Sequence, residues 1–253
     1  MSLWRGGVLG KGLWQGGLLR SPASRFHPLT LFANGEGGGW WDLSNTQHLW
    51  VDQARTQHPI DGDLVWWIDD QSGNGLHIGA ADTNSRGTYR VSNGRPYLDL
   101  TSGHYYSSSA RNGVANTYII AAFRPPSGDF ALRGTNDGAG ILMMGAEGVD
   151  APAFRDIAPS DTPPIRLDGA SYSYANRDDI FTSMAARDNV VTIGPLEFVD
   201  QFEVVATRHF NWSNGNDYPL VRWYGEIEVE RALTSAEISA AEAYLAARAG
   251  ISL

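Results

Sequence analysis

The chain has 253 residues, of which 42% are hydrophobic, including nine Trp, ten Tyr and nine Phe. This length fits one large domain with a packed core and a short appendage, or two small domains. The formal net charge of −9 is uneven, because residues 1–30 carry four Arg or Lys and no Asp or Glu, so that segment is +4 and the remainder −13. An acidic body argues against nucleic acid as a partner, since phosphate binding requires a basic surface.

Cysteine is absent, which excludes disulfides and thiolate chemistry. No apolar run approaches the roughly 18 to 20 residues of a membrane span, so we expect no membrane insertion. The N-terminal segment lacks the continuous apolar stretch and small-residue cleavage pattern of a secretory signal, because Lys11 and several glycines interrupt it. We therefore expect synthesis and folding in a cytoplasm.

Residues 1–30 predict an extended arm. The unit Leu-Trp-Xaa-Gly-Gly-Val/Leu-Leu occurs at residues 3–9 and again at residues 13–19. It is too apolar for a solvated tail and too rich in glycine for a stable helix, because each interior Gly costs about 1 kcal/mol relative to Ala. We expect the arm to anchor on a partner protein; the alternative is that it folds back on its own domain as an extra strand. The anchoring side chains would be Leu3, Trp4, Leu9, Leu13, Trp14 and Leu19.

From residue 31 to residue 253, short apolar and aromatic runs alternate with clusters of Gly, Pro, Asn and Asp. This pattern is typical of an antiparallel sandwich or jelly roll. The predicted strands fall at residues 64–68, 96–100, 117–123, 140–145, 190–194, 202–210 and 221–230.

One helix is predicted at the end of the chain. Thr234 followed three residues later by Glu237 is a capping box, apolar residues then recur at helical spacing, and Gly250 supplies the stop. A second, short helix is expected near residues 42–52.

Three stretches in order resemble a known family. They are "DQSGNGLHI" (70–78), "RPYLDLTSGHYY" (95–106) and "WYGEIEVERALTSAEISAAEAYLAARAGI" (223–251). Together they resemble the laminin-G-like, concanavalin-A-like jelly-roll domains of tailed-bacteriophage virion surface proteins. The resemblance implies an all-β, two-layer antiparallel concanavalin-A-like jelly-roll sandwich over residues 31–253, with the extended N-terminal arm outside it and a short C-terminal helix.

The resemblance also implies a function. We expect a virion surface protein of the head spike, fibre or decoration type, synthesised in the host cytoplasm and anchored by its arm to capsid or tail subunits. It would form a homo-oligomer and present the jelly-roll domain for host glycan attachment, without a cofactor and without enzymatic activity. The alternative is a decoration protein with a purely structural role. Head or tail location, oligomeric symmetry and the identity of a glycan are not fixed by the sequence.

Aromatic residues beside Gly-, Ser- and Asn-rich turns are candidates for stacking on sugar rings. The competing interpretation is that they belong to the core, as most tryptophans of a sandwich do. The candidates are Trp40, Trp41, Tyr105, Tyr106 and Trp212.

The segment "GEIEVE" supports a different class of function. It places Glu226, Glu228 and Glu230 two residues apart, which on a strand puts three carboxylates on one face. This resembles the Glu-x-Asp-x-Glu strand of concanavalin-A-like glucanases, with Glu in place of the central Asp, and glycoside hydrolysis needs two neighbouring carboxyl groups. Alternation with Ile227 and Val229 equally fits an ordinary half-exposed strand with its polar face in solvent, and this is the interpretation we expect to hold.

Metal binding has little support in the sequence. Asp61, Asp63, Asp69 and Asp70 are oxygen ligands of the kind that suits Ca²⁺, but the spacing of a twelve-residue calcium loop is absent. The six histidines show no zinc pattern. We expect no metal, with calcium at these aspartates as the weak alternative.

Overall fold

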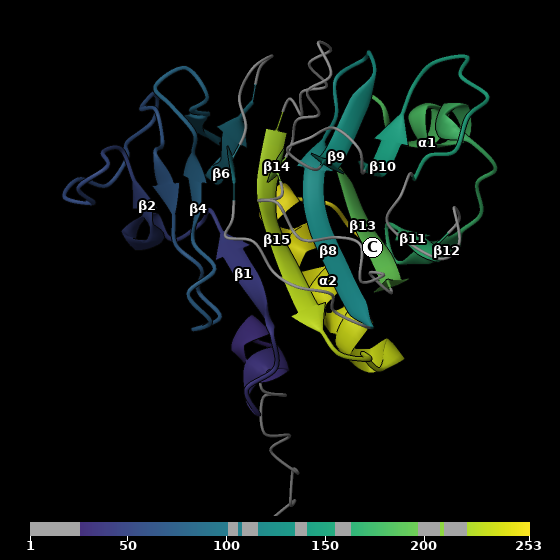
Figure 1. The fold of residues 1–253 in the computed structure, drawn as a ribbon, viewed down its shortest axis with the longest axis horizontal. Helices are drawn as coiled ribbons and strands as arrows, with labels where there is room; N and C mark the ends of the chain where they lie inside the picture. Colours follow the sequence, from purple (N-terminus) through teal and green to yellow (C-terminus); the bar gives the residue numbers. More distant parts are fainter. Residues whose placement is uncertain are drawn as a thin grey trace, which may run out of the picture.

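The computed structural model describes residues 26–100, 106–107, 116–134, 141–154, 163–196, 208–209 and 222–253. Within them the protein is a sandwich of two antiparallel sheets with a helix at the C-terminal end of the chain (Figure 1). The predicted all-β, two-layer sandwich is confirmed. The anchoring residues of the arm lie outside the described residues, so the arm and its boundary at residue 30 stay predictions.

The first sheet contains the long strands. Its order is β12–β11–β13–β8–β15–β6–β5, and β1 also pairs with β15. The bounds are β1 Gly38–Asp42, β5 Thr88–Ser92, β6 Arg95–Asp99, β8 Thr117–Arg124, β11 Ile165–Leu167, β12 Ala170–Tyr172, β13 Asn189–Leu196 and β15 Arg222–Glu230.

The second sheet is built from shorter strands in the order β10–β9–β14–β7–β4–β3–β2. The bounds are β2 Leu49–Trp50, β3 Trp67–Ile68, β4 Ile78–Ala80, β7 Tyr106–Ser107, β9 Phe130–Gly134, β10 Ile141–Gly145 and β14 Arg208–His209.

Two 3₁₀ turns and two α-helices complete the described chain. They are η1 Pro28–Phe32, η2 Thr46–His48, α1 Arg177–Met184 and α2 Ser235–Ala249. Neither α1 nor α2, the α-helices of the described ranges, is long and apolar enough to cross a membrane. Of the short helix expected near residues 42–52, only the 3₁₀ turn η2 forms, because β1 continues to Asp42 and β2 begins at Leu49.

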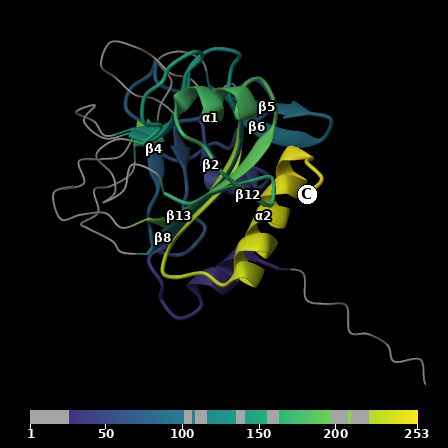
Figure 2. The same ribbon diagram turned by 90° about the vertical axis from the view of Figure 1, so that its right-hand side faces the viewer.

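The C-terminal helix α2 matches its prediction. The Thr234 side chain accepts a hydrogen bond from the Glu237 N–H, the Glu237 carboxylate accepts one from the Thr234 N–H, and Gly250 ends the helix at φ 73°. Figure 2 shows α2 along one face of the first sheet, where it contacts β8, β13 and β15. This face is called the outer face below, and the face toward the second sheet the inner face.

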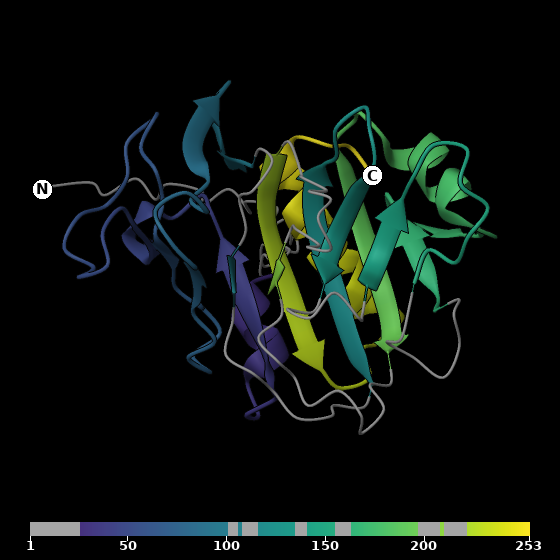
Figure 3. The ribbon, with the colours of Figure 1, turned by 45° about the horizontal axis from the view of Figure 1, so that its top comes forward.

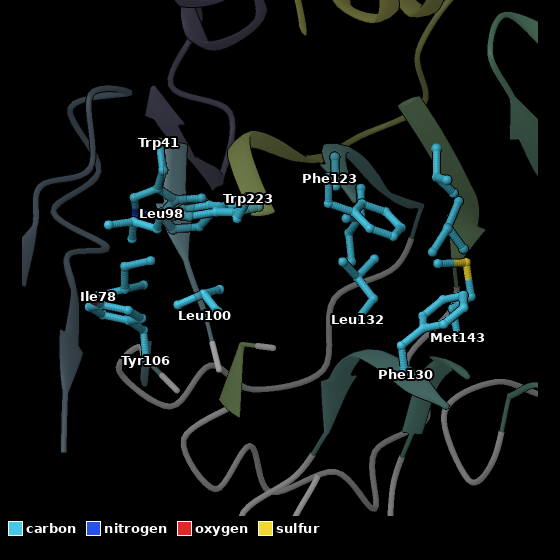
Figure 4. Packing of buried hydrophobic residues seen from close by; sticks show 14 of the residues in the cluster. Trp41, Ile78, Leu98, Leu100, Tyr106, Phe123, Phe130, Leu132, Met143 and Trp223 are labelled. Carbon is cyan, nitrogen blue, oxygen red and sulfur yellow. The ribbon is translucent and has the colours of Figure 1, made fainter. Parts of the chain in front are cut away.

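The residues of β8 alternate between two cores. Ile119, Ala121 and Phe123 belong to the cluster between the sheets, whereas Ile120 and Ala122 belong to the cluster under α2. Because both faces of β8 are buried, its sequence is a continuous apolar run. Figure 4 shows the inter-sheet cluster, with Trp41, Leu98 and Trp223 gathered together and Phe123, Leu132 and Phe130 further along.

Candidate functional site

The register of β15 places its glutamates on the inner face. Glu226 pairs with Trp41 of β1 and with Ala121 of β8, and both of these belong to the inter-sheet core. Residues opposite each other in neighbouring strands point to the same face. The prediction that Glu226, Glu228 and Glu230 share one face is therefore confirmed.

The expectation that this face meets solvent is wrong. The intervening residues Ile227 and Val229 pack in the cluster under α2, so the glutamates point toward the second sheet. Glu226 is fully buried, Glu228 is 3% exposed and Glu230 is partly exposed. Burying a carboxylate is costly, and sites where a sequence accepts this cost are candidates for function.

A bulge in β15 sets this orientation. The pairing with β8 shifts between Trp223 and Gly225, and Gly225 has φ 151°. The extra residue allows Trp223 and Glu226, three positions apart, both to reach the inner face. An uninterrupted strand would have pointed one of them at α2.

The strand β1 flanks the two most buried glutamates. Its inner-face residues Trp41 and Gly39 lie opposite Glu226 and Glu228. A Cβ at Gly39 would lie 2.6 Å from the Trp41 indole ring, so the missing side chain leaves the space that this ring occupies. A Cβ at Gly38 would lie 2.0 Å from the Glu228 carbonyl oxygen, so this glycine allows β1 to approach β15.

Glu230 has a different environment at the end of the strand. Its N–H donates to the Gly37 carbonyl at 3.0 Å, and a Cβ at Gly37 would lie 1.9 Å from Glu230 Oε2. The carboxylate thus occupies the space beside Gly37. Because packing against Gly37 accounts for the position of Glu230, Glu226 and Glu228 are the better candidates for a pair of reacting carboxyl groups.

The proposed sugar-stacking rings are core residues where they are described. Trp40, Trp41 and Tyr106 are all buried, so they are not exposed platforms. Trp40 points to the outer face, which α2 covers, and the Tyr106 hydroxyl donates to the Val65 carbonyl at 2.8 Å. Burial also raises the pKa of Tyr106. Tyr105 and Trp212 lie outside the described residues.

The aspartates proposed for calcium do not converge on one point. Asp61 accepts from the Val91 N–H, Asp63 from the Ile60 N–H, and Asp69 pairs with Arg55 at 3.0 Å. Within the described ranges, no group of three or more His, Asp or Glu is arranged to hold a metal ion. These carboxylates instead order the loops that carry them, as does Asp70.

Comparisons with known proteins give a likeness of fold. No protein-family model matches the chain, and no curated protein matches it. Three solved structures do: an arabinofuranosidase complexed with arabinofuranosyl-α-1,2-xylobiose, and two GH54 α-L-arabinofuranosidases, one a mutant soaked with 4-nitrophenyl α-L-arabinofuranoside and one soaked with a cyclic sulfate inhibitor. The identities are 13%, 13% and 12%, and the TM-scores 0.49, 0.49 and 0.45.

Each match covers 88% of this chain but only 65 or 66% of the solved chain, so this protein spans less than two thirds of their length. The prediction that the chain is not an enzyme is contradicted, because all three matches are glycosidases. At this identity the likeness concerns the fold, and no residue is transferred from it. None of the three bears on a virion protein.

Proposed function

We propose that the protein is a glycoside hydrolase in which Glu226 and Glu228 supply the two carboxyl groups. The observation that carries this proposal is their burial side by side on the inner face of the central strand β15. Hydrolysis of a glycosidic bond requires two neighbouring carboxyl groups, and this strand holds two of them on one face.

The spacing suits this chemistry. Two residues apart in an extended strand, the Cα atoms lie about 6.6 Å from each other with both side chains on one face. One carboxyl group in its protonated form gives its proton to the glycosidic oxygen as the bond to the anomeric carbon breaks. The other, ionised, either attacks the anomeric carbon or takes a proton from the attacking water. Water is consumed, and two hydroxyl groups result.

Trp41 and the small neighbours of the pair support this role. The Trp41 indole lies beside Gly39, and Glu226 lies opposite the small side chain of Ala121. Small neighbours limit the apolar bulk against the carboxyl groups, while the buried Trp41 ring packs in the inter-sheet core beside them.

The virion setting stays a proposal beside this one. A particle-bound glycosidase that acts on host surface polysaccharide would combine both. The homo-oligomer and the capsid or tail partner depend on the arm, whose anchoring residues lie outside the described residues.

The test is hydrolysis by the full chain. Purified protein is assayed on a panel of 4-nitrophenyl glycosides, including the α-L-arabinofuranoside, and on neutral plant and bacterial polysaccharides. We expect turnover of at least one substrate, and a loss of about 10²- to 10⁴-fold in Glu226→Gln and in Glu228→Gln. A wild-type protein inactive on the whole panel, or variants as active as wild type, would refute the proposal.

A further inference from the structure

The loop of residues 70–76 connects β3 and β4 of the second sheet, yet it is hydrogen bonded to β1 of the first sheet. The Gln71 N–H donates to the Trp40 carbonyl at 2.7 Å, and the Gln71 side-chain amide donates to the Asp42 carbonyl at 3.0 Å. The Asn74 amide donates to the Glu36 and Gly38 carbonyls, each at 2.9 Å. The loop thus takes the place of a strand on the edge of β1 that does not face β15.

Asp70 organises this loop. Its carboxylate is 7% exposed and accepts hydrogen bonds from the Trp40 N–H at 2.9 Å, the Ser72 N–H and hydroxyl, each at 2.8 Å, and the Leu76 N–H at 3.1 Å. One side chain therefore fixes both the fold of the loop and its contact with β1. Four donors on one carboxylate leave it little freedom to reorient.

The loop also holds the indole beside the glutamates. The Trp41 Nε1–H donates to the Leu76 carbonyl at 3.0 Å, and the Leu76 N–H donates to Asp70. Figure 3 shows β1, in purple, alongside the yellow-green β15 that carries the glutamates. Since β1 has only five residues, its position depends on both of its edges.

We infer that Asp70 is a positioning residue for the glutamate site, acting through the 70–76 loop on Trp41 and β1. This inference rests on the proposed function for its effect on catalysis, but its structural step can be measured separately. Displacement of a supporting group by about 1 Å can cost about 100-fold in rate without removing any reacting group.

The test compares Asp70→Asn with a matched control, Asp82→Asn. Asp82 also caps a turn, where it accepts from the Asn84 N–H and from the Ser85 N–H and hydroxyl. It lies in the loop after β4, and these donors belong to that loop and not to β1. In Asp70→Asn an NH₂ group replaces one carboxylate oxygen, and this group cannot accept the hydrogen bonds that the oxygen accepted.

Two readouts are used. Hydrogen exchange of the Trp41 indole N–H, followed by NMR, should accelerate at least about tenfold in Asp70→Asn and remain at the wild-type rate in Asp82→Asn. On the substrate found for the wild type, kcat should fall about tenfold or more in Asp70→Asn, with KM changed much less. A merely structural role would lower the melting temperature without this division between kcat and KM.

Unchanged indole exchange in Asp70→Asn, or equal acceleration in Asp82→Asn, would overturn the inference. If Asp70→Asn does not fold, Asn74→Ala removes the bonds to the Glu36 and Gly38 carbonyls and is judged by the same two readouts. A wild-type protein without hydrolase activity would refute the proposed function, and the indole exchange would still decide whether Asp70 positions Trp41.

Discussion

Both faces of the first sheet bury carboxylates, in different surroundings. On the outer face, Glu242 of α2 is 1% exposed and accepts from Arg166 Nε at 2.8 Å, Arg166 Nη2 at 3.0 Å and the Thr192 hydroxyl at 2.8 Å. On the inner face, Glu226 lies opposite Trp41 and Ala121, and Glu228 lies opposite Gly39 and Ile119.

A second outer-face carboxylate follows the pattern of Glu242. Burial alone would raise the pKa of Asp42, but hydrogen bonds from Ser44 and Tyr244 and the charge of Arg248 hold it below its usual value. The Arg248 Nη2 to Asp42 Oδ2 distance is 3.0 Å. Carboxylates under α2 thus attach the helix to the sheet, whereas those on β15 are the reacting groups of the proposed function.

The largest change in stability is expected where β1 meets β15. Gly38→Ala should destabilise the fold by about 2–3 kcal/mol or more, because Gly38 has φ 114° and an added Cβ would lie 2.0 Å from the Glu228 carbonyl oxygen. The measurement is urea unfolding. The control is Gly73→Ala, at φ 95° with open space around the new Cβ, which carries the backbone strain alone. Equal losses in both variants would show that the approach of β1 to β15 is not tight.

The next largest effect on stability is expected at Glu242, the buried carboxylate of α2. Glu242→Gln should cost about 1.5–3 kcal/mol of unfolding free energy, because it weakens charge-assisted hydrogen bonds to Arg166 and leaves a cation with a weaker partner. Turnover of the substrate should stay near the wild-type rate, because Glu242 lies on the far side of the sheet. Loss of turnover in a variant that remains folded would contradict the division between the two faces.

The smallest effect lies at the start of α2. The hydrogen bond and charge of Arg231, together with the capping bonds to Thr234, lower the pKa of Glu237 from 4.5 to about 2. The folded-state pKa is depressed, so this stabilisation is complete above about pH 4.5 and is lost as the pH falls toward 2. Glu237→Gln should cost about 1 kcal/mol at pH 7, by chemical denaturation, and progressively less below pH 4. If the difference in unfolding free energy between wild type and Glu237→Gln did not shrink in acid, an ionised Glu237 in the capping box would be contradicted.

The sequence predicted the long strands β8, β13 and β15 and the helix α2, but it missed α1 and many of the short strands. It also gave the wrong surroundings for the glutamate face of β15. Alternation along residues 226–230 shows that the glutamates share a face, but both faces of a central strand are buried, so alternation alone cannot distinguish a solvated face from one facing a second sheet. The deciding fact is that α2 covers Ile227 and Val229, which is a tertiary contact.

The segment around β1 was misread for a related reason. No strand was predicted there, whereas Gly38 and Gly39 lie in one and leave space for β15 and for the Trp41 ring. The role of the 70–76 loop was equally hidden, because turn chemistry explains its glycines without revealing which backbone the Asp70 carboxylate binds. The capping box of α2, by contrast, is local in sequence and was predicted correctly.

The most direct measurement compares two buried carboxylates in one assay. Glu226→Gln and Glu242→Gln make the same chemical change on opposite faces of the first sheet, and turnover and melting temperature are recorded for both. We expect Glu226→Gln to lose about 10²- to 10⁴-fold in turnover with its fold retained, and Glu242→Gln to lose stability with turnover retained. Turnover retained in a folded Glu226→Gln protein would contradict a catalytic role for the inner-face glutamates.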